Sequence, residues 1–214
     1  PRPARDYAEM LFGALIAHNE QRATLILEDC QKYFELLTIF QEIILPAMEL
    51  ISLAWYRGEI LLATEHIAAN YIKSRLMATM QNLPLVKEGA LILVGCGPEE
   101  MKELEPLMFS ILLRQQGYFV EYLGPDLDVE DLLDYSASVR PRLICLTIHE
   151  ESTAFLLKNF AAQLAGIRGK PKLAYAGKYL TENEKARQEL GGTWLGKNLS
   201  ESMERIKVFF STMN

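Results

Sequence analysis

Apolar and polar positions along the first 82 residues repeat with the period of an α-helix. Between residues 7 and 19, one helix face collects these apolar side chains: Tyr7, Met10, Leu11, Ala14 and Leu15. The same spacing recurs over residues 20–34, 38–58 and 60–80. Four helices joined by short links are typical of an up-and-down four-helix bundle, which we expect for this part of the chain.

Two residues in the third segment, residues 38–58, indicate where its helix is interrupted and where it ends. Pro46 lies in its middle and has no N–H to donate, so we expect it to kink the helix or to split it. Gly58 follows the last apolar residues and predicts the end of the helix there.

The pattern changes near residue 84. Short apolar runs then alternate with amphipathic stretches; the runs read "GALILVGCG", "YFVEYLG", "PRLICLTI" and "KLAYAG". Helices are expected over residues 101–117, 128–139, 152–167, 181–192 and 199–210, with Asp128 and Thr181 as N-terminal caps and Gly117 ending the first. This alternation predicts a flavodoxin-like, doubly wound parallel sheet of the α/β class over residues 85–214, after a helical bundle over residues 1–84.

Composition and charge narrow the class of function. The chain has 214 residues, 50% of them hydrophobic, and a net charge of −6, which argues against a direct grip on DNA or on an anionic membrane. No signal peptide and no apolar run of membrane-spanning length is evident, so we expect no membrane contact. Three cysteines without paired spacing favour free thiols and the cytoplasm. The opening "PRPAR" lacks a Met, so we expect a longer parent protein.

No sequence motif indicates an enzyme: Walker, GxGxxG and HExxH patterns are absent. The unusual stretch is instead "AWYRGEILLATEHIAAN", in which Trp55 is followed ten residues later by the pair Glu65-His66. Taken singly, Trp55 would be a core residue, His66 a satisfied bundle histidine and Glu65 a solvated carboxylate.

The combination of a bundle, this sheet and three motifs resembles a known family. The motifs are "AWYRGEILLATEHIAANYIKSRL", the turn after the first strand and "YLGPD" after the second. Over essentially the whole chain they resemble the cobalamin-binding, light-sensing domain of MerR-type transcription regulators, the CarH family. The resemblance implies that the bundle caps the upper face of a cobalamin between bundle and sheet. Trp55 would pack against an upper group such as that of adenosylcobalamin, and Glu65 and His66 would hydrogen-bond it.

The resemblance also implies partners. In that family light breaks the cobalt–carbon bond and changes the oligomeric state, which releases DNA bound by a separate winged-helix domain. We therefore expect a homo-oligomer, in the first place a dimer, that meets DNA only through a separate domain absent from this chain. The protein would be a sensor and not an enzyme.

The lower half of the implied site departs from the family pattern. The family's cobalt ligand lies in Glu-x-His-x-x-Gly after the first strand; here Glu100 fits, Lys102 replaces the His and Glu105 replaces the Gly. A lysine at neutral pH has no free lone pair, so we do not expect it to bind cobalt. The nearest other imidazole is His149, after the third strand, which we expect to be a channel-lining or surface residue. In the channel for the nucleotide tail, the resemblance keeps Thr147 and Gly177.

Several ligands stay open at this point. One is a cobalamin without a protein lower ligand; a second is another tetrapyrrole, haem or biliverdin, with Lys102 paired to a propionate. A third possibility is an oligomerisation module without a ligand. The rival function is the corrinoid carrier of a methyltransferase, although carriers normally use the cobalt-binding His that this chain lacks. The cofactor-binding residues expected on the first two readings are Trp55, Glu65, His66, Glu100, Lys102, Thr147 and Gly177.

Overall fold

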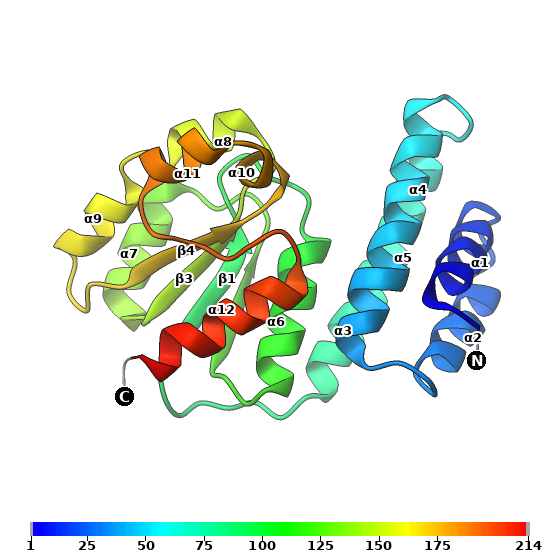
Figure 1. Cartoon of the computed structure of the whole chain (residues 1–214), viewed down its shortest axis with the longest axis horizontal. Coiled ribbons are helices and arrows are strands. Elements are labelled where there is room, and N and C mark those ends of the chain that lie inside the picture. Colours follow the sequence, from blue (N-terminus) through cyan, green and yellow to red (C-terminus); the bar gives the residue numbers. More distant parts are fainter. Residues whose placement is uncertain (1, 213–214) are drawn as a thin grey trace. The chain divides into compact units, whose positions relative to one another are not determined.

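The structure, a computed structural model, describes residues 2–212 and divides into two compact units (Figure 1). The units are Pro1–Thr79 and Met80–Asn214, and the division falls inside the last helix of the bundle. Each unit is described by itself below.

The first unit is a bundle of four helical runs. The first two are α1 (Ala4–Ile16) and α2 (Glu20–Cys30). The third is an uninterrupted run made of α3 (Leu36–Thr38), η1 (Ile39–Ile44) and α4 (Leu45–Tyr56), and the fourth is α5 (Leu62–Asn82). Gly58 follows the third run with φ +73°, so its role as a helix end is confirmed.

An apolar core and contacts between polar side chains hold the bundle together. Among its fully buried side chains are Leu11, Ile43, Ile51, Ile72 and Leu76. The hydroxyls of Thr24 and Tyr71 lie 2.8 Å apart and join α2 to α5. Nε2 of His18, just after α1, lies 3.2 Å from Oγ1 of Thr64 at the start of α5.

Pro46 does not split its helical run, so one of the two outcomes expected from the sequence is wrong, while the expected kink stays a prediction. The turn before it is a π-helix, in which the N–H of Leu45 donates to the carbonyl of Phe40, five residues back. A π turn is wider than an α turn and shifts the hydrogen-bond register, so it accommodates the missing donor of proline without breaking the run.

The same helix corrects a second expectation. Leu36–Tyr56 is 21 residues long and contains an 18-residue stretch with a mean hydropathy of 1.7, so by length and composition alone it is able to cross a membrane. One face of the run is buried, through Ile39, Phe40, Ile43, Ile44, Ala47, Ile51 and Ala54. Because α1 contacts both η1 and α4, this face serves as the core of the bundle.

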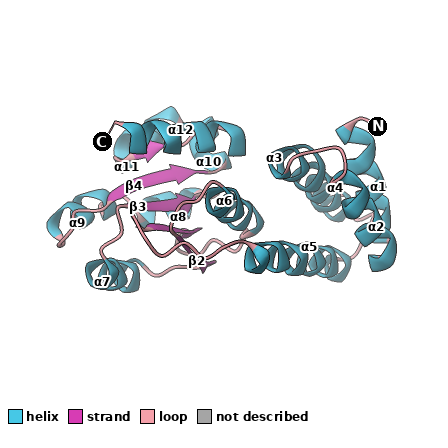
Figure 2. Cartoon of the chain, turned by 90° about the horizontal axis from the view of Figure 1, so that it is seen from below, coloured by secondary structure: helices cyan, strands magenta, loops and turns pink. Residues whose placement is uncertain are grey.

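The second unit contains a five-stranded, all-parallel sheet, which confirms the predicted fold class (Figure 2). The strands are β1 (Ile92–Cys96), β2 (Val120–Gly124), β3 (Leu143–Thr147), β4 (Lys172–Ala176) and β5 (Thr193–Trp194). Their order, β2-β1-β3-β4-β5, is that of flavodoxin-like sheets. The sequence did not identify β5, which pairs only two residues with β4.

Helices cover both faces of the sheet. They are α6 (Leu104–Gln115), α7 (Val129–Val139), α8 (Glu151–Leu156), α9 (Phe160–Gly166), α10 (Lys178–Glu182), α11 (Glu184–Leu190) and α12 (Leu199–Ser211). On one face, α6 contacts β1, β2 and β3, and α12 packs against α6. On the other face, helices α7 to α11 cover strand side chains such as Leu93 and Ile144.

Two predicted helix ends are confirmed and two expectations are wrong. Asp128 caps α7 by accepting hydrogen bonds from the N–H groups of Glu130 and Asp131, and Gly117 follows α6 with φ +84°. The helix expected over residues 152–167 is divided into α8 and α9 by a turn that buries both of its apolar flanks, Leu157 and Phe160.

Thr181 does not cap a helix. Its hydroxyl donates to the carbonyl of Gly177 from within α10, and Asn183 caps α11 instead by accepting from the N–H of Ala186. Serine and threonine hydroxyls often bond back to the preceding turn in this way, so a threonine near a helix start is an ambiguous signal.

Candidate functional site

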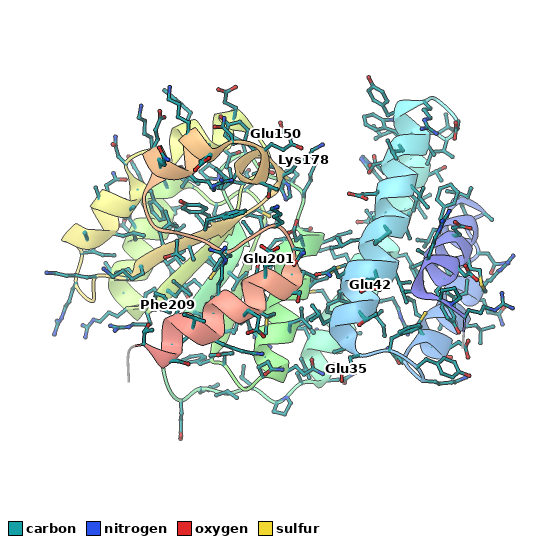
Figure 3. The ribbon with its side chains drawn as sticks, viewed as in Figure 1. Glu35, Glu42, Glu150, Lys178, Glu201 and Phe209 are labelled. Carbon is teal, nitrogen blue, oxygen red and sulfur yellow. The ribbon has the colours of Figure 1, made fainter. Side chains whose placement is uncertain are left out.

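The chain leaves the sheet on opposite faces after β1 and after β3, which lie side by side. In doubly wound sheets, ligands bind at such a switch point, at the carboxyl ends of the strands. We call this border the carboxyl edge; it comprises residues 97–105, 147–150 and 177–178. The expected residues Glu100, Lys102, Thr147, His149 and Gly177 all lie there. Glu150 and Lys178 mark this end of the unit (Figure 3).

Glu100 ties two loops of the carboxyl edge together. Its side chain is buried, and Oε1 accepts hydrogen bonds from the N–H groups of His149 at 2.6 Å and Glu150 at 2.8 Å. The hydroxyl of Thr153 donates to the same oxygen at 3.2 Å. A buried carboxylate needs such a set of donors to offset the loss of its hydration. Glu100 therefore joins the loop after β1 to the loop after β3.

The loop after β1 is also bound to the loop after β2. The N–H of Asp126 donates to the carbonyl of Glu100 at 2.9 Å, and the N–H of Glu99 donates to Oδ1 of Asp126 at 2.9 Å. Glu99 adopts a left-handed backbone with φ +61° to make this contact. The segment "GCGPEE" at the end of β1 and the segment "YLGPD" at the end of β2 are thus joined by two hydrogen bonds.

His149 bridges two elements through its ring. Nδ1 accepts the backbone N–H of Lys178 at 3.3 Å, and Nε2 lies 3.6 Å from Oε2 of Glu105. Because Nδ1 is an acceptor, the hydrogen-bond network places the proton of the neutral ring on Nε2. In this tautomer Nε2 has no lone pair for a metal, so the geometry does not present His149 as a metal ligand.

Glu105 lies in the first turn of α6, facing that imidazole. Burial raises the pKa of the Glu105 carboxyl, and the positive charge that His149 carries when protonated acts in the opposite direction. The position expected to hold a glycine thus holds a carboxylate that is engaged with a histidine from the next loop.

Lys102 lies on the surface of the same edge. Its Nζ is 3.5 Å from Oε1 of Glu150, and the two side chains are 69% and 61% exposed. Such an exposed pair contributes at most about 1 kcal/mol and leaves the ammonium free to exchange partners. Lys102 is therefore available to an anionic ligand group, and its failure to bind a metal stays a prediction.

Thr147 ends β3 with a buried hydroxyl. Its Oγ1 has no hydrogen-bond partner of good geometry among residues 2–212, and its cross-strand neighbour is Cys96. Burial raises the pKa of the Cys96 thiol to about 12, so this neighbour is a neutral thiol. Buried polar atoms without partners are uncommon and mark places where a bound group is able to supply one.

Gly177 follows β4 with φ +121°. A Cβ atom there would lie 2.1 Å from the carbonyl oxygen of Ile148, so no other residue fits without moving the backbone. The close approach of the β3 and β4 ends explains this glycine without a ligand.

The bundle carries the other three expected residues on its surface. Trp55, on α4, is 43% exposed, and His66, on α5, is exposed as well. Neither is a core residue, which is the condition for contact with a ligand.

Glu65 is held by a residue that sequence reasoning missed. Oγ of Ser52 donates to Oε1 of Glu65 at 3.0 Å. Ser52 lies three residues before Trp55 and hence on the same stripe of α4. The contact therefore brings the Glu65 carboxylate to the stripe that carries Trp55. The i, i+3 spacing was the available signal for Ser52, whereas nothing in the sequence marked Thr153.

With this geometry in hand, we compared the chain with known proteins. Residues 7–78 match the family model described as the B12 binding domain, which covers the bundle. The transcriptional repressor CarH of Myxococcus xanthus is 26% identical over 144 residues, which are 67% of this chain and 48% of the relative. The chain thus spans about half the length of the curated relative that it matches.

Two solved structures share the fold over nearly the whole chain. The monomethylamine corrinoid protein of Methanosarcina barkeri has a TM-score of 0.77 at 14% identity, covering 96% of this chain and 100% of that one. A cobalamin-binding protein from Desulfitobacterium hafniense has a TM-score of 0.52 at 16% identity, covering 98% and 99%. These likenesses show a common fold.

Proposed function

We propose that this chain is a cobalamin-binding sensory domain of a transcriptional regulator. The match of residues 7–78 to the B12 binding domain carries the proposal, together with the similarity to CarH. In this proposal the bundle supplies contacts to the upper side of the ligand, and the carboxyl edge supplies contacts to the lower side.

The residues of the bundle suit a bulky, polar upper group. The exposed indole of Trp55 offers a flat apolar surface of the kind that packs against an adenine ring. Glu65 supplies acceptors and His66 a donor for the hydroxyls of a ribose. Ser52 would act as a positioning residue, because its hydrogen bond fixes the Glu65 carboxylate before any ligand arrives.

The carboxyl edge suits a corrinoid that takes no imidazole from the protein. Lys102 is a cation paired with Glu150, and His149 carries its proton on the nitrogen that faces Glu105. The Thr147 hydroxyl has at most a weak contact with the Cys96 thiol and is able to donate to a ligand, and Lys102 supplies a charge for a phosphate or carboxylate. A bound cobalamin would supply a cobalt–carbon bond that light can break.

The output that we propose follows the family resemblance. The domain would form a homo-oligomer, in the first place a dimer, whose assembly depends on the ligand and on light. DNA would be bound by a separate domain, and the regulator would work in the cytoplasm. The acidic charge of −6 suits a domain that leaves DNA binding to another part of the protein.

Haem or biliverdin is the alternative ligand on the same surfaces. Lys102 favours it, because a lysine is a good partner for a propionate and a poor one for cobalt. In that case Trp55 and His66 would pack against the ring system instead of an adenosyl group.

A corrinoid carrier for a methyltransferase is the second candidate function. The fold that this chain shares with the monomethylamine corrinoid protein favours it. A carrier exchanges a methyl group and needs an open apolar cap, whereas Trp55, Glu65 and His66 suit a large polar group. Preference for adenosylcobalamin over methylcobalamin would therefore separate the sensor from the carrier.

The proposal is tested by adding cobalamins, haem and biliverdin in turn to the purified chain and recording absorption spectra and affinities. We expect adenosylcobalamin to bind with a spectrum that shows no protein imidazole on cobalt, and illumination to change the sedimentation of the complex. Binding of haem or biliverdin alone would replace cobalamin as the ligand. Failure of all three to bind would refute the sensory function.

A further inference from the structure

Two copies of one short pattern, cation-Pro-cation-Leu, lead into neighbouring strands. Arg140-Pro141-Arg142-Leu143 leads into β3 and Lys170-Pro171-Lys172-Leu173 into β4. The two strands are parallel partners and lie side by side in both views of the ribbon (Figures 1 and 2). We call this border of the sheet, formed by residues 89–91, 139–143 and 167–172, the amino edge. It is the border opposite the carboxyl edge of the same unit.

The first cation of each copy has a strained backbone. Arg140 has φ +54° and Lys170 has φ +45°, both in the left-handed region. Residues other than glycine, asparagine and aspartate are uncommon in this region. The left-handed conformation of Arg140 ends α7, so the conformation itself serves the fold. What is unusual is that a cation stands at both positions, where Gly or Asn would fit the backbone better.

The two copies are in direct contact. A Cβ atom built on Gly169 would lie 3.4 Å from Cβ of Arg140, so the turn before β4 packs on the turn before β3. The N–H of Lys172 donates to the carbonyl of Arg142 at 3.1 Å, which continues the pairing of the strands up to the turns. The cations of both copies are thus gathered at one place.

Arg140 and Arg142 of the first copy, together with Gly169 just before Lys170 of the second, border an open hollow of about 450 Å³. Its lining includes Arg140 and Arg142 as cations, Phe119 and Val139 as apolar side chains, and Glu121 as a carboxylate. Glu121 is engaged, because the hydroxyl of Tyr135 donates to its Oε2 at 2.6 Å. A hollow of a few hundred cubic ångströms with a mixed lining is of the size that holds a small organic molecule.

The local charge is opposite to that of the whole chain. The net charge is −6, yet residues 140–172 place Arg140, Arg142, Arg168, Lys170 and Lys172 at this edge. Within the part of the chain that the structure describes, Arg140, Arg168, Lys170 and Lys172 form no ion pair with a carboxylate. These cations outnumber Glu121, the carboxylate in the lining of the hollow, so they repel one another and attract an anion.

We propose that the amino edge binds a small phosphate-bearing molecule, with Arg140 and Lys170 from the two turns holding the phosphate. Guanidinium and ammonium groups are the standard partners of phosphate oxygens, and Phe119 and Val139 offer a surface to an organic remainder. Nucleic acid fits less well, because its backbone requires an extended stripe of cations and these are confined to two adjacent turns. The site is independent of the cobalamin proposal.

The test measures calorimetric binding of pyrophosphate and of AMP to the full chain at about 0.1 M salt, with a duplex DNA as a third probe. The test variant is the double substitution Arg140→Asn with Lys170→Asn. Asparagine tolerates the left-handed region better than arginine or lysine, so the variant removes both charges while easing the backbone. The matched control is Lys158→Ala with Lys185→Ala, two exposed lysines that do not line the hollow.

We expect saturable binding of AMP or pyrophosphate, at least a tenfold loss of affinity in the double Asn variant, and no change in the control. Arg140→Lys with Lys170→Arg should retain most of the affinity. Equal binding by the test and control variants, or no saturation at 10 mM ligand, roughly the weak limit of specific binding, would overturn the proposal. Binding of the duplex without binding of AMP or pyrophosphate would overturn it as well.

Discussion

Nε2 of His149 faces Oε2 of Glu105 at 3.6 Å, while its other ring nitrogen accepts a backbone N–H. The two side chains come from the loop after β3 and from the first turn of α6, and they face each other at a distance slightly too long for a hydrogen bond. This arrangement places a carboxyl whose pKa is raised by burial where the family pattern has a glycine, and this carboxyl makes the stability of the sheet unit dependent on pH.

Glu105→Gln should stabilise the protein more at pH 8 than at pH 4. Burial raises the pKa of Glu105, so the folded protein holds this proton more tightly than the unfolded chain does. The stability from the neutral carboxyl is complete below the unfolded pKa of about 4.3 and is lost as the pH rises through the folded pKa. Thermal unfolding at both pH values should show a gain of roughly 2–4 °C at pH 8 only. Glu182→Gln, on an exposed carboxylate, is the control, and a gain independent of pH would contradict the argument.

Lys102→His combined with Glu105→Gly should create the imidazole ligand that the chain lacks. We expect cobalamin to bind at least tenfold more tightly and its absorption spectrum to show a histidine on cobalt. Lys158→His, which adds an imidazole elsewhere on the surface, should change neither. Glycine in the first turn of α6 costs about 1 kcal/mol, which leaves the fold intact. A histidine-ligated spectrum for the unmodified protein would show that the ligand position has been misassigned.

Trp55→Ala should weaken the binding of adenosylcobalamin about tenfold and that of methylcobalamin much less, because the smaller group cannot reach the indole. The side chain is 43% exposed, so the free energy of unfolding should change by less than about 1 kcal/mol. Tyr56→Ala is the matched control, since Tyr56 is the adjacent residue and is 84% exposed. Equal effects of the two variants on affinity would remove Trp55 from the site.

Glu100→Ala should destabilise the fold by about 3 kcal/mol, because it leaves the N–H groups of His149 and Glu150 and the Thr153 hydroxyl without an acceptor. Chemical denaturation of the unliganded protein measures this loss directly. Glu150→Ala, which removes a carboxylate that is 61% exposed, should cost less than about 0.5 kcal/mol. A loss of ligand affinity by Glu100→Ala without a loss of stability would instead indicate direct contact with the ligand.

Gly177→Ala should be among the most damaging single changes in the sheet unit. The added Cβ would lie 2.1 Å from the carbonyl oxygen of Ile148, so the ends of β3 and β4 must separate. We expect a loss of 3 kcal/mol or more, on the order of that for overpacked cores. Gly166→Ala is the control: its Cβ would meet nothing within 4 Å, and it should be neutral or slightly stabilising.

The periodicity of the sequence was sufficient to predict strands that are buried on both faces and helices that are capped by a nearby residue. Fully buried strands such as Ile92–Cys96 appear as apolar runs, and Asp128 caps its helix by a local contact that the sequence displays directly. The strand Thr193–Trp194 was not predicted, because two residues are too few to show an alternation of apolar and polar positions. The turn between α8 and α9 was not predicted, because Leu157 and Phe160 are both buried and their spacing is the same as in a continuous helix.

The site could be predicted only as far as its residues are local in the chain. Trp55, Glu65 and His66 lie within twelve residues, and their surface position agrees with a role in binding. The partners of Glu100 lie about fifty residues away, so its part in joining the two loops could not be read from the sequence. The proton position on His149 depends on a backbone N–H of Lys178, which only the fold brings near.

The π turn before Pro46 has a consequence for how related chains are aligned with this one. A π turn holds about one residue more than the α turn that it replaces. Compared with a plain α-helix, the turn between Phe40 and Leu45 therefore accommodates one extra residue. The helix beyond Leu45 still presents its faces in the same directions as it would without that residue. A relative with a plain α-helix here would need one residue fewer to bring its own aromatic side chain to the place of Trp55. An alignment without a gap in this turn would pair Trp55 with a residue on the neighbouring face, and the binding surface of the bundle would be misidentified.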